Sequence, residues 1–167
     1  HSDAAGVIFE IRDGNPNLMV DPLAKRWHDM MWAGQGVQAA SEMIAAQSNN
    51  QIPAVMKDPR LAMTVWEKNT AIMEKYNEPG RFSAFIGYEW TAMVKGNNLH
   101  RVVVYRDGGD KGGQMVPYTT VAPQGSTNPR KLWEWLAQYE RKTKGEVLAI
   151  AHNGNLSNGM MFPLDIQ

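Results

Sequence analysis

The pattern of apolar and polar positions predicts helices in the first half of the chain. One run places apolar side chains at the spacing of an α-helix: Leu23, Trp27, Met30 and Met31. This helix begins at Asp21, because Asp is a good N-cap and the Pro22 that follows suits the first helical position. It ends at Gly34. A second helix is predicted over about residues 37–47, and a third, which begins at another Asp-Pro pair, over about 58–77.

Three later runs are predicted to be buried strands, because they are short stretches rich in β-branched, aromatic and other apolar residues. They cover residues 81–90, 97–105 and 146–151. A helix from Asn128 to about Lys144 precedes the third run. Buried strands flanked by helices indicate an α/β fold, and the short join before the third strand is typical of a barrel or a doubly wound sheet. We therefore expect one α/β domain.

The remaining segments give mixed signals. The first 22 residues combine an apolar stretch with a loop at residues 13–17. Four glycines between residues 108 and 113 predict a flexible turn. Residues 114–127 predict irregular structure with a short strand near Val116.

One polar residue stands at or near an end of each predicted strand. Glu89 lies near the end of the first strand, His100 near the start of the second, and His152 directly after the third. A buried carboxylate is costly unless it is paired or bound to a metal. Side chains alternate along a strand, so the three can converge if their faces point into one barrel. One carboxylate and two imidazoles suit a divalent metal.

Each of these residues taken alone is more typical of a structural or surface position. The convergence of all three is what favours a metal site. The fourth histidine, His28, lies in the middle of a predicted helix and is assigned no role.

Composition narrows the function classes. The 17 basic and 17 acidic residues balance, and no basic stripe indicates a nucleic-acid partner. The lack of Cys excludes disulfides and thiolate metal sites, and no apolar run reaches the length of a membrane span. The chain begins at His1 without an initiator Met and is expected to be a fragment of a longer protein. The localisation therefore stays open, with export of the parent protein as one alternative.

Three motifs carry a resemblance to a known family. They are Phe85-Ile-Gly-Tyr-Glu-Trp90, Gly96-Asn-Asn-Leu-His-Arg101 and Ala149-Ile-Ala-His-Asn-Gly-Asn-Leu-Ser-Asn-Gly159. They resemble a bacterial family catalogued as a domain of unknown function, which is similar to the PHP (polymerase and histidinol phosphatase) metal-dependent phosphoesterases. The resemblance covers residues 1–164. It implies that residues 1–167 form part of a distorted (β/α)7 PHP-like barrel, with metals at the C-terminal rim of the strands.

The resemblance also implies roles for individual residues. Glu89 matches a bridging metal ligand, and His100 and His152 match two further ligands. His1 matches the last residue of an early Thr-Asp-His ligand motif. Asn153 stands where the wider superfamily has Pro, so the loop after His152 departs from the pattern. Counterparts of the first and last ligand motifs of the family are expected outside this sequence.

The implied activity is that of a metal-dependent hydrolase, with zinc, manganese or iron as the metal and a small phosphorylated molecule as the substrate. Such a metal would supply an activated hydroxide. Candidate substrate contacts follow a ligand or lie close to one in the sequence: Asn153, Asn155, Ser157, Asn158, Lys95 and Arg101. Ordinary turn chemistry explains the loop residues equally well, and a solvated charge is the simpler interpretation of Arg101.

Two other functions stay open at this point. One is hydrolysis of a non-phosphate ester or amide, since a fold does not fix its substrate. The other is a non-catalytic scaffold with a structural metal. A partial barrel would leave strand edges and apolar surface unpaired, so self-association is expected, together with weak binding of a second metal and low activity.

Overall fold

The structure is a computed structural model that describes residues 5–162, and it divides into two compact units. The first covers residues 5–66 and the second residues 67–162. Helix α5 (Pro59–Tyr76) crosses the division. Residues 5–162 thus form two compact units, and the expected single domain stays a prediction.

The first unit is helical. Its elements are α1 (Ala5–Arg12), α2 (Pro16–Met19), α3 (Pro22–Trp32), α4 (Gly36–Ser48), the 3-10 helix η1 (Ala54–Lys57) and the start of α5. Asp21 begins α3 as predicted, because its Oδ1 accepts hydrogen bonds from the N–H groups of Leu23 (2.9 Å) and Ala24 (3.1 Å). The core is built around fully buried side chains from α1, α2 and α3, among them Ile11, Leu18 and Trp27.

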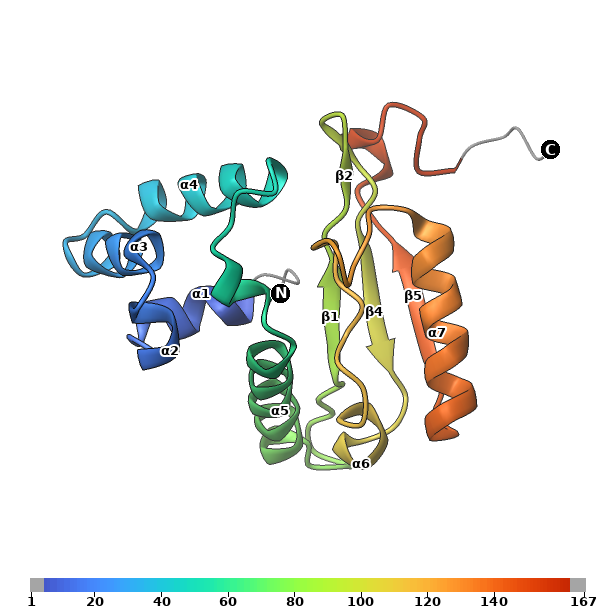
Figure 1. Cartoon of the computed structure of the whole chain (residues 1–167). Coiled ribbons are helices and arrows are strands. Elements are labelled where there is room, and N and C mark those ends of the chain that lie inside the picture. Colours follow the sequence, from blue (N-terminus) through green and yellow to red (C-terminus); the bar gives the residue numbers. More distant parts are fainter. Residues whose placement is uncertain (1–4, 163–167) are drawn as a thin grey trace. The chain divides into compact units, whose positions relative to one another are not determined.

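The second unit is a three-stranded sheet packed against a helix (Figure 1). The strands are β1 (Gly87–Trp90), β4 (Arg101–Tyr105) and β5 (Val147–Ala151), in the order β1-β4-β5. Both pairings are antiparallel. A separate hairpin joins β2 (Met93–Val94) to β3 (Asn97–Asn98). The other elements are α6 (Gly109–Gly112), α7 (Pro129–Thr143) and the 3-10 helix η2 (Gly154–Leu156).

The two faces of the sheet differ in burial. One face carries Tyr88, Val103 and Tyr105, which are buried, and the ring of Tyr105 meets that of Tyr139 in α7 edge-on at 5.0 Å. The opposite face carries Glu89, Val102 and Ile150, which the strand registers place side by side. Val102 is 37% exposed, Leu148 59% and Ile150 49%. The strands 97–105 and 146–151 were expected to be buried, and on this second face that expectation is wrong.

Several sequence predictions need correction. The first strand covers residues 87–90 and not 81–90, and Phe85 before it is exposed. The glycines after residue 107 form the short helix α6 in place of a flexible turn, and no strand lies near Val116. Residues 5–20, where the sequence signals were mixed, form the helices α1 and α2. The helices predicted over about 22–33, 37–47, 58–77 and 128–144 are confirmed.

The mixture of helices and sheet is consistent with the expected α/β class. Within residues 5–162 the sheet stays open and does not close into a barrel. None of the helices in these residues combines the length and the apolar character needed to cross a membrane.

Candidate metal centre

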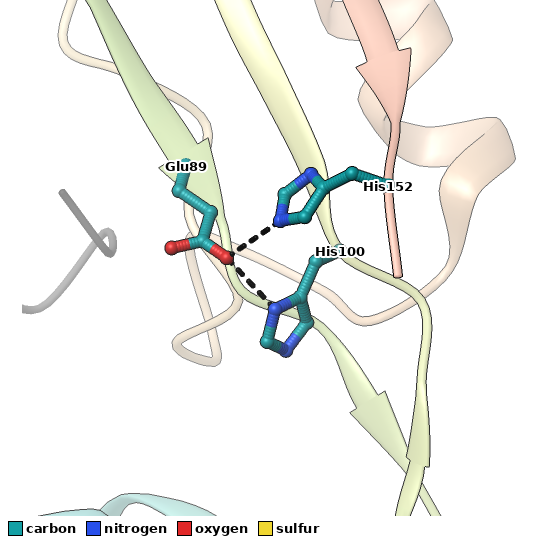
Figure 2. A group of neighbouring side chains, drawn as sticks. All are labelled: Glu89, His100 and His152. Carbon is teal, nitrogen blue, oxygen red and sulfur yellow. Dashed lines mark hydrogen bonds and ion pairs between the residues drawn. The ribbon is translucent and has the colours of Figure 1, made fainter. Parts of the chain in front are cut away.

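Glu89, His100 and His152 converge at one end of the three-stranded sheet, as the sequence predicts (Figure 2). One ligand atom from each lies within 4.8 Å of the others. Glu89 comes from β1, His100 directly precedes β4, and His152 directly follows β5. In residues 5–162 this is the one group of three or more carboxylate or imidazole side chains close enough to share a metal.

The antiparallel pairing explains why His100 belongs to the group. β1 and β5 run in the same direction and β4 runs against both. The C-terminal ends of β1 and β5 therefore lie beside the N-terminal end of β4. A histidine before β4 thus meets a histidine after β5, and the N–H of His152 donates to the carbonyl of His100 at 3.3 Å.

One carboxylate oxygen of Glu89 lies within hydrogen-bond distance of both imidazole rings. Oε1 of Glu89 lies 2.8 Å from Nδ1 of His100 and 3.0 Å from Nε2 of His152. The two rings lie nearly edge-on, with centroids 5.7 Å apart. The side chains are mostly shielded from solvent, at 14% exposure for His100, 25% for Glu89 and 29% for His152. Oε2 of Glu89 accepts no hydrogen bond from the described residues.

The far nitrogens of both rings lack partners. Nε2 of His100 and Nδ1 of His152 are buried and have no hydrogen-bond partner among the described residues. A metal-bound histidine usually donates its other N–H to an acceptor that fixes the tautomer and the ring orientation. His100 is held through its main chain instead. Its backbone N–H donates to Oδ1 of the Asn98 side chain at 2.9 Å.

Gly87, two residues before Glu89, lies where the backbone of the neighbouring strand leaves no room for a side chain. A Cβ at this position would lie 2.7 Å from the carbonyl oxygen of Val103 in the neighbouring strand. The same glycine lies on the face of β1 that carries Glu89. The structure assigns it to close contact between strands.

The remaining sequence candidates are dispersed. Asn153, Asn155 and Asn158 are exposed in the loop after His152, where Asn153 and Asn158 adopt positive φ. Ser157 is buried and its hydroxyl donates to the carbonyl of Gly154 at 2.7 Å. Lys95 is exposed in the turn between β2 and β3. The positions of the asparagines are compatible with ordinary turn chemistry.

Arg101 is a different case, because the solvated charge expected from the sequence is wrong. Its residue is 5% exposed, on the face opposite the three ligands. Its guanidinium donates to the carbonyl of Leu99 at 2.6 Å and lies 5.6 Å from the ring centroid of Trp90. Burial lowers the pKa of Arg101 from its ordinary value. The predicted ligand His1 lies outside the described residues.

Comparison with known proteins gives one result. Searches of curated proteins and of solved structures found no match. The profile of a family described as a protein of unknown function, DUF3604, matches residues 1–167. Because this match spans the whole chain, the chain belongs to the DUF3604 family.

Proposed function

We propose that Glu89, His100 and His152 bind a divalent metal and that the protein is a metal-dependent phosphoesterase. The observation that carries the proposal is the convergence of one carboxylate oxygen and two imidazole nitrogens at one end of the sheet. The motifs around these residues, and the resemblance to PHP phosphoesterases that they carry, supply the reaction class. The same resemblance supports a sheet that forms part of a distorted PHP-like barrel, in which β4 runs antiparallel to its neighbours.

The three donors fit such a metal. Zinc, manganese and iron all accept imidazole and carboxylate ligands. Two ligands at about 2.0–2.2 Å from a tetrahedral ion lie roughly 3.4 Å apart. Glu89 lies 2.8 Å from one ring nitrogen and 3.0 Å from the other. Each contact therefore needs to open by about half an ångström, which small side-chain rotations provide.

The chain contributes charge and position. Glu89 supplies the negative charge, and its unpaired Oε2 leaves it able to bridge to a second ion. The backbone hydrogen bond from His152 to His100 holds the two histidines next to each other. When bound, a divalent metal lowers the pKa of a coordinated water and polarises a phosphoryl oxygen.

The surroundings of the site favour a small phosphoryl group held chiefly by the metal. Apart from the three ligands, this face of β1, β4 and β5 carries Gly87, Val102, Val104, Leu148 and Ile150, none of which is charged. Asn153, Asn155 and Asn158 are exposed just after His152 and provide amide donors for phosphoryl oxygens. Lys95 stays a weaker candidate and Arg101 is removed, because its burial on the opposite face separates it from the ligands.

Metal titration and turnover of an aryl phosphate test the proposal, with Glu89→Gln as the variant and His28→Asn as the matched control. His28 lies outside the group, and its Nδ1 contacts the carbonyl of Ile11 at 2.8 Å. We expect the wild-type chain and His28→Asn to bind about one equivalent of zinc. We expect Glu89→Gln to bind zinc at least about 100-fold more weakly and to lose turnover.

Each outcome distinguishes the alternatives. Metal binding with cleavage of carboxyl esters or amides alone would replace phosphoester substrates with those classes. Metal binding without hydrolysis would leave a structural or scaffold role. Equal zinc affinity in the wild type and Glu89→Gln would refute the metal site itself.

A further inference from the structure

The segment between β3 and β4 consists of Leu99 and His100, and its main chain is held on both sides. The N–H of Leu99 donates to the carbonyl of Ala92 at 2.9 Å, and the carbonyl of His100 accepts the N–H of His152 at 3.3 Å. Backbone groups away from water are usually satisfied by other backbone groups in this way. These two bonds tie one side of each residue to a neighbouring segment.

The other two backbone bonds come from the side chains that flank the segment. The N–H of His100 donates to Oδ1 of Asn98 at 2.9 Å, and Nη1 of Arg101 donates to the carbonyl of Leu99 at 2.6 Å. The N–H and the carbonyl of both residues in the segment are therefore bonded. These bonds leave the main chain at His100 little freedom, although the residue lies outside the strands.

The two side chains that make these bonds are both buried, at 6% exposure for Asn98 and 5% for Arg101. Burial of a polar side chain costs free energy unless its hydrogen bonds compensate for the lost water. Among the described residues Arg101 has no carboxylate partner, so an ion pair does not account for its burial. What Asn98 and Arg101 share is a bond to the main chain at or next to His100.

The hairpin of β2 and β3 supports both histidines. Lys95 and Gly96 form its two-residue turn, and their φ angles of 51° and 79° have the positive sign that a tight type I′ hairpin turn requires. Asn98 lies in β3 and bonds His100, while η2 follows His152 closely and packs against β3. The hairpin therefore contacts the segments that carry two of the three proposed ligands.

We propose that Asn98 and Arg101 are positioning residues that set the imidazole of His100 for the metal. Their bonds fix the main chain from which the ring extends, and its Nδ1 lies 2.8 Å from Oε1 of Glu89 (Figure 2). A ligand set has to be held to within about half an ångström to bind a metal well. Both residues act through the main chain of the ligand and not on the metal itself.

One part of this inference rests on the proposed function and the other does not. The expected effect on metal affinity requires the metal site to exist. The fixing of His100 does not, because the four backbone bonds form in the metal-free chain. The two parts can therefore be measured separately.

Two pairs of variants isolate the two side-chain bonds. Asn98→Ser and Asn98→Ala differ by one hydroxyl oxygen, which can accept the N–H that Oδ1 of Asn98 accepts. Arg101→Lys and Arg101→Met differ by a cationic donor for the carbonyl of Leu99. Comparison within a pair removes the effect of the volume that both members lose.

Asn97→Ala is the matched control in the same strand. Nδ2 of Asn97 donates to the carbonyl of Val94 at 3.1 Å, so this change loosens the hairpin and leaves the bonds of residues 99 and 100 in place. It separates the stability of the hairpin from the positioning of His100. Urea denaturation confirms that each variant is folded before metal is added.

Zinc titration measures the effect on affinity. We expect Asn98→Ala to bind zinc about 10- to 100-fold more weakly than Asn98→Ser, and Arg101→Met to show a similar loss against Arg101→Lys. Loss of a positive charge would by itself favour a cation, so weaker binding by Arg101→Met reports the missing hydrogen bond. Equal affinities within both pairs, or the same loss in Asn97→Ala, would overturn the positioning role.

NMR of the metal-free chain tests the fixing of His100 directly. Three-bond couplings that report its side-chain angle χ1 should give one rotamer in the wild type and in Asn98→Ser, and averaged rotamers in Asn98→Ala. A chain that binds no zinc but shows this difference would refute the proposed metal site and support the positioning of His100. A single rotamer in all three proteins would overturn the inference whether or not zinc binds.

Discussion

At the scale of single residues, Arg101 shows how burial can separate neighbours in the sequence. It follows His100 directly, yet its side chain lies on the buried face of the sheet and the imidazole on the exposed one. Among the described residues no carboxylate lies within ion-pair distance of its guanidinium. Its positive charge is therefore offset by one carbonyl and by the face of Trp90 alone.

This arrangement predicts that the charge of Arg101 contributes little to stability while its volume contributes more. Arg101→Met keeps much of the side-chain volume and removes a desolvated cation, so the free energy of unfolding should change by less than about 1.5 kcal/mol. Arg101→Ala leaves a cavity and should cost about 2–5 kcal/mol. Urea denaturation of both variants measures the difference. Equal losses would mean that the hydrogen bond to Leu99 dominates.

The group of three side chains was predictable from the sequence, but its surroundings were not. Glu89, His100 and His152 stand out because a polar group at the end of a β-forming run needs a reason. The burial of Arg101 and the lack of partners for the far ring nitrogens depend on side chains that arrive from other segments. No pattern within the three strands reports them.

At the scale of elements, the helices that begin with a cap followed by proline were predicted well. Asp21, Asp58 and Asn128 each precede a proline, and each accepts a backbone N–H of its own helix. Asn15 and Pro16 use the same device at α2, which has only four residues and no helical run of apolar positions to accompany the cap. A local hydrogen bond is encoded by neighbours in the sequence, so local reasoning finds it.

The strands were predicted less well, because pairing is not local. Residues 81–86 contain apolar side chains, but their pairing with β4 stops at Ile86, whose carbonyl accepts from Tyr105. The runs 102–105 and 147–151 are apolar on both faces, which is typical of strands covered on both sides. In the described residues α7 packs against one side. A continuous apolar run predicts that a strand is buried, but it does not predict which segment packs against it.

One carboxylate, that of Asp107, connects β4, α6 and β5 at the other end of the sheet. Oδ1 of Asp107 accepts from Nζ of Lys111 in α6 at 2.8 Å, and its Oδ2 accepts from the N–H of Glu146, just before β5, at 2.7 Å. Asp107 itself follows β4 by two residues. The Lys111 bond first, and then the backbone N–H of Glu146, hold the pKa of Asp107 below its ordinary value.

These bonds predict that the free energy of unfolding falls at acid pH. A carboxyl whose pKa is lower in the folded state stabilises that state above its unfolded pKa of about 4. The contribution is lost as pH falls through the folded pKa. Asp107→Asn should therefore be less stable than the wild type at pH 7, and the difference should shrink below about pH 4. Urea denaturation across this range measures it. A difference independent of pH would exclude the charge of Asp107 as the cause.

At the scale of the whole molecule, the proposed ligands all belong to one of the two compact units. Glu89, His100 and His152 lie in residues 67–162, whereas the helical core around Trp27 lies in residues 5–66. A ligand that binds the folded state and not the unfolded state stabilises whatever opens together with its site. The division of the chain therefore predicts which of the two units a bound metal stabilises.

Zinc should slow hydrogen exchange in the unit that contains the ligands and leave the other unit nearly unchanged. At a zinc concentration 100 times Kd, the stabilisation is about 2.7 kcal/mol, or roughly 100-fold slower exchange for amides that open with the site. We expect this protection in β1, β4 and β5 and not in α1, α3 or α4, as measured by mass spectrometry. Glu89→Gln should abolish it. Equal protection in residues 5–66 would mean that the two units unfold as one, because stabilisation at the sheet would then reach every amide whose exchange requires global opening.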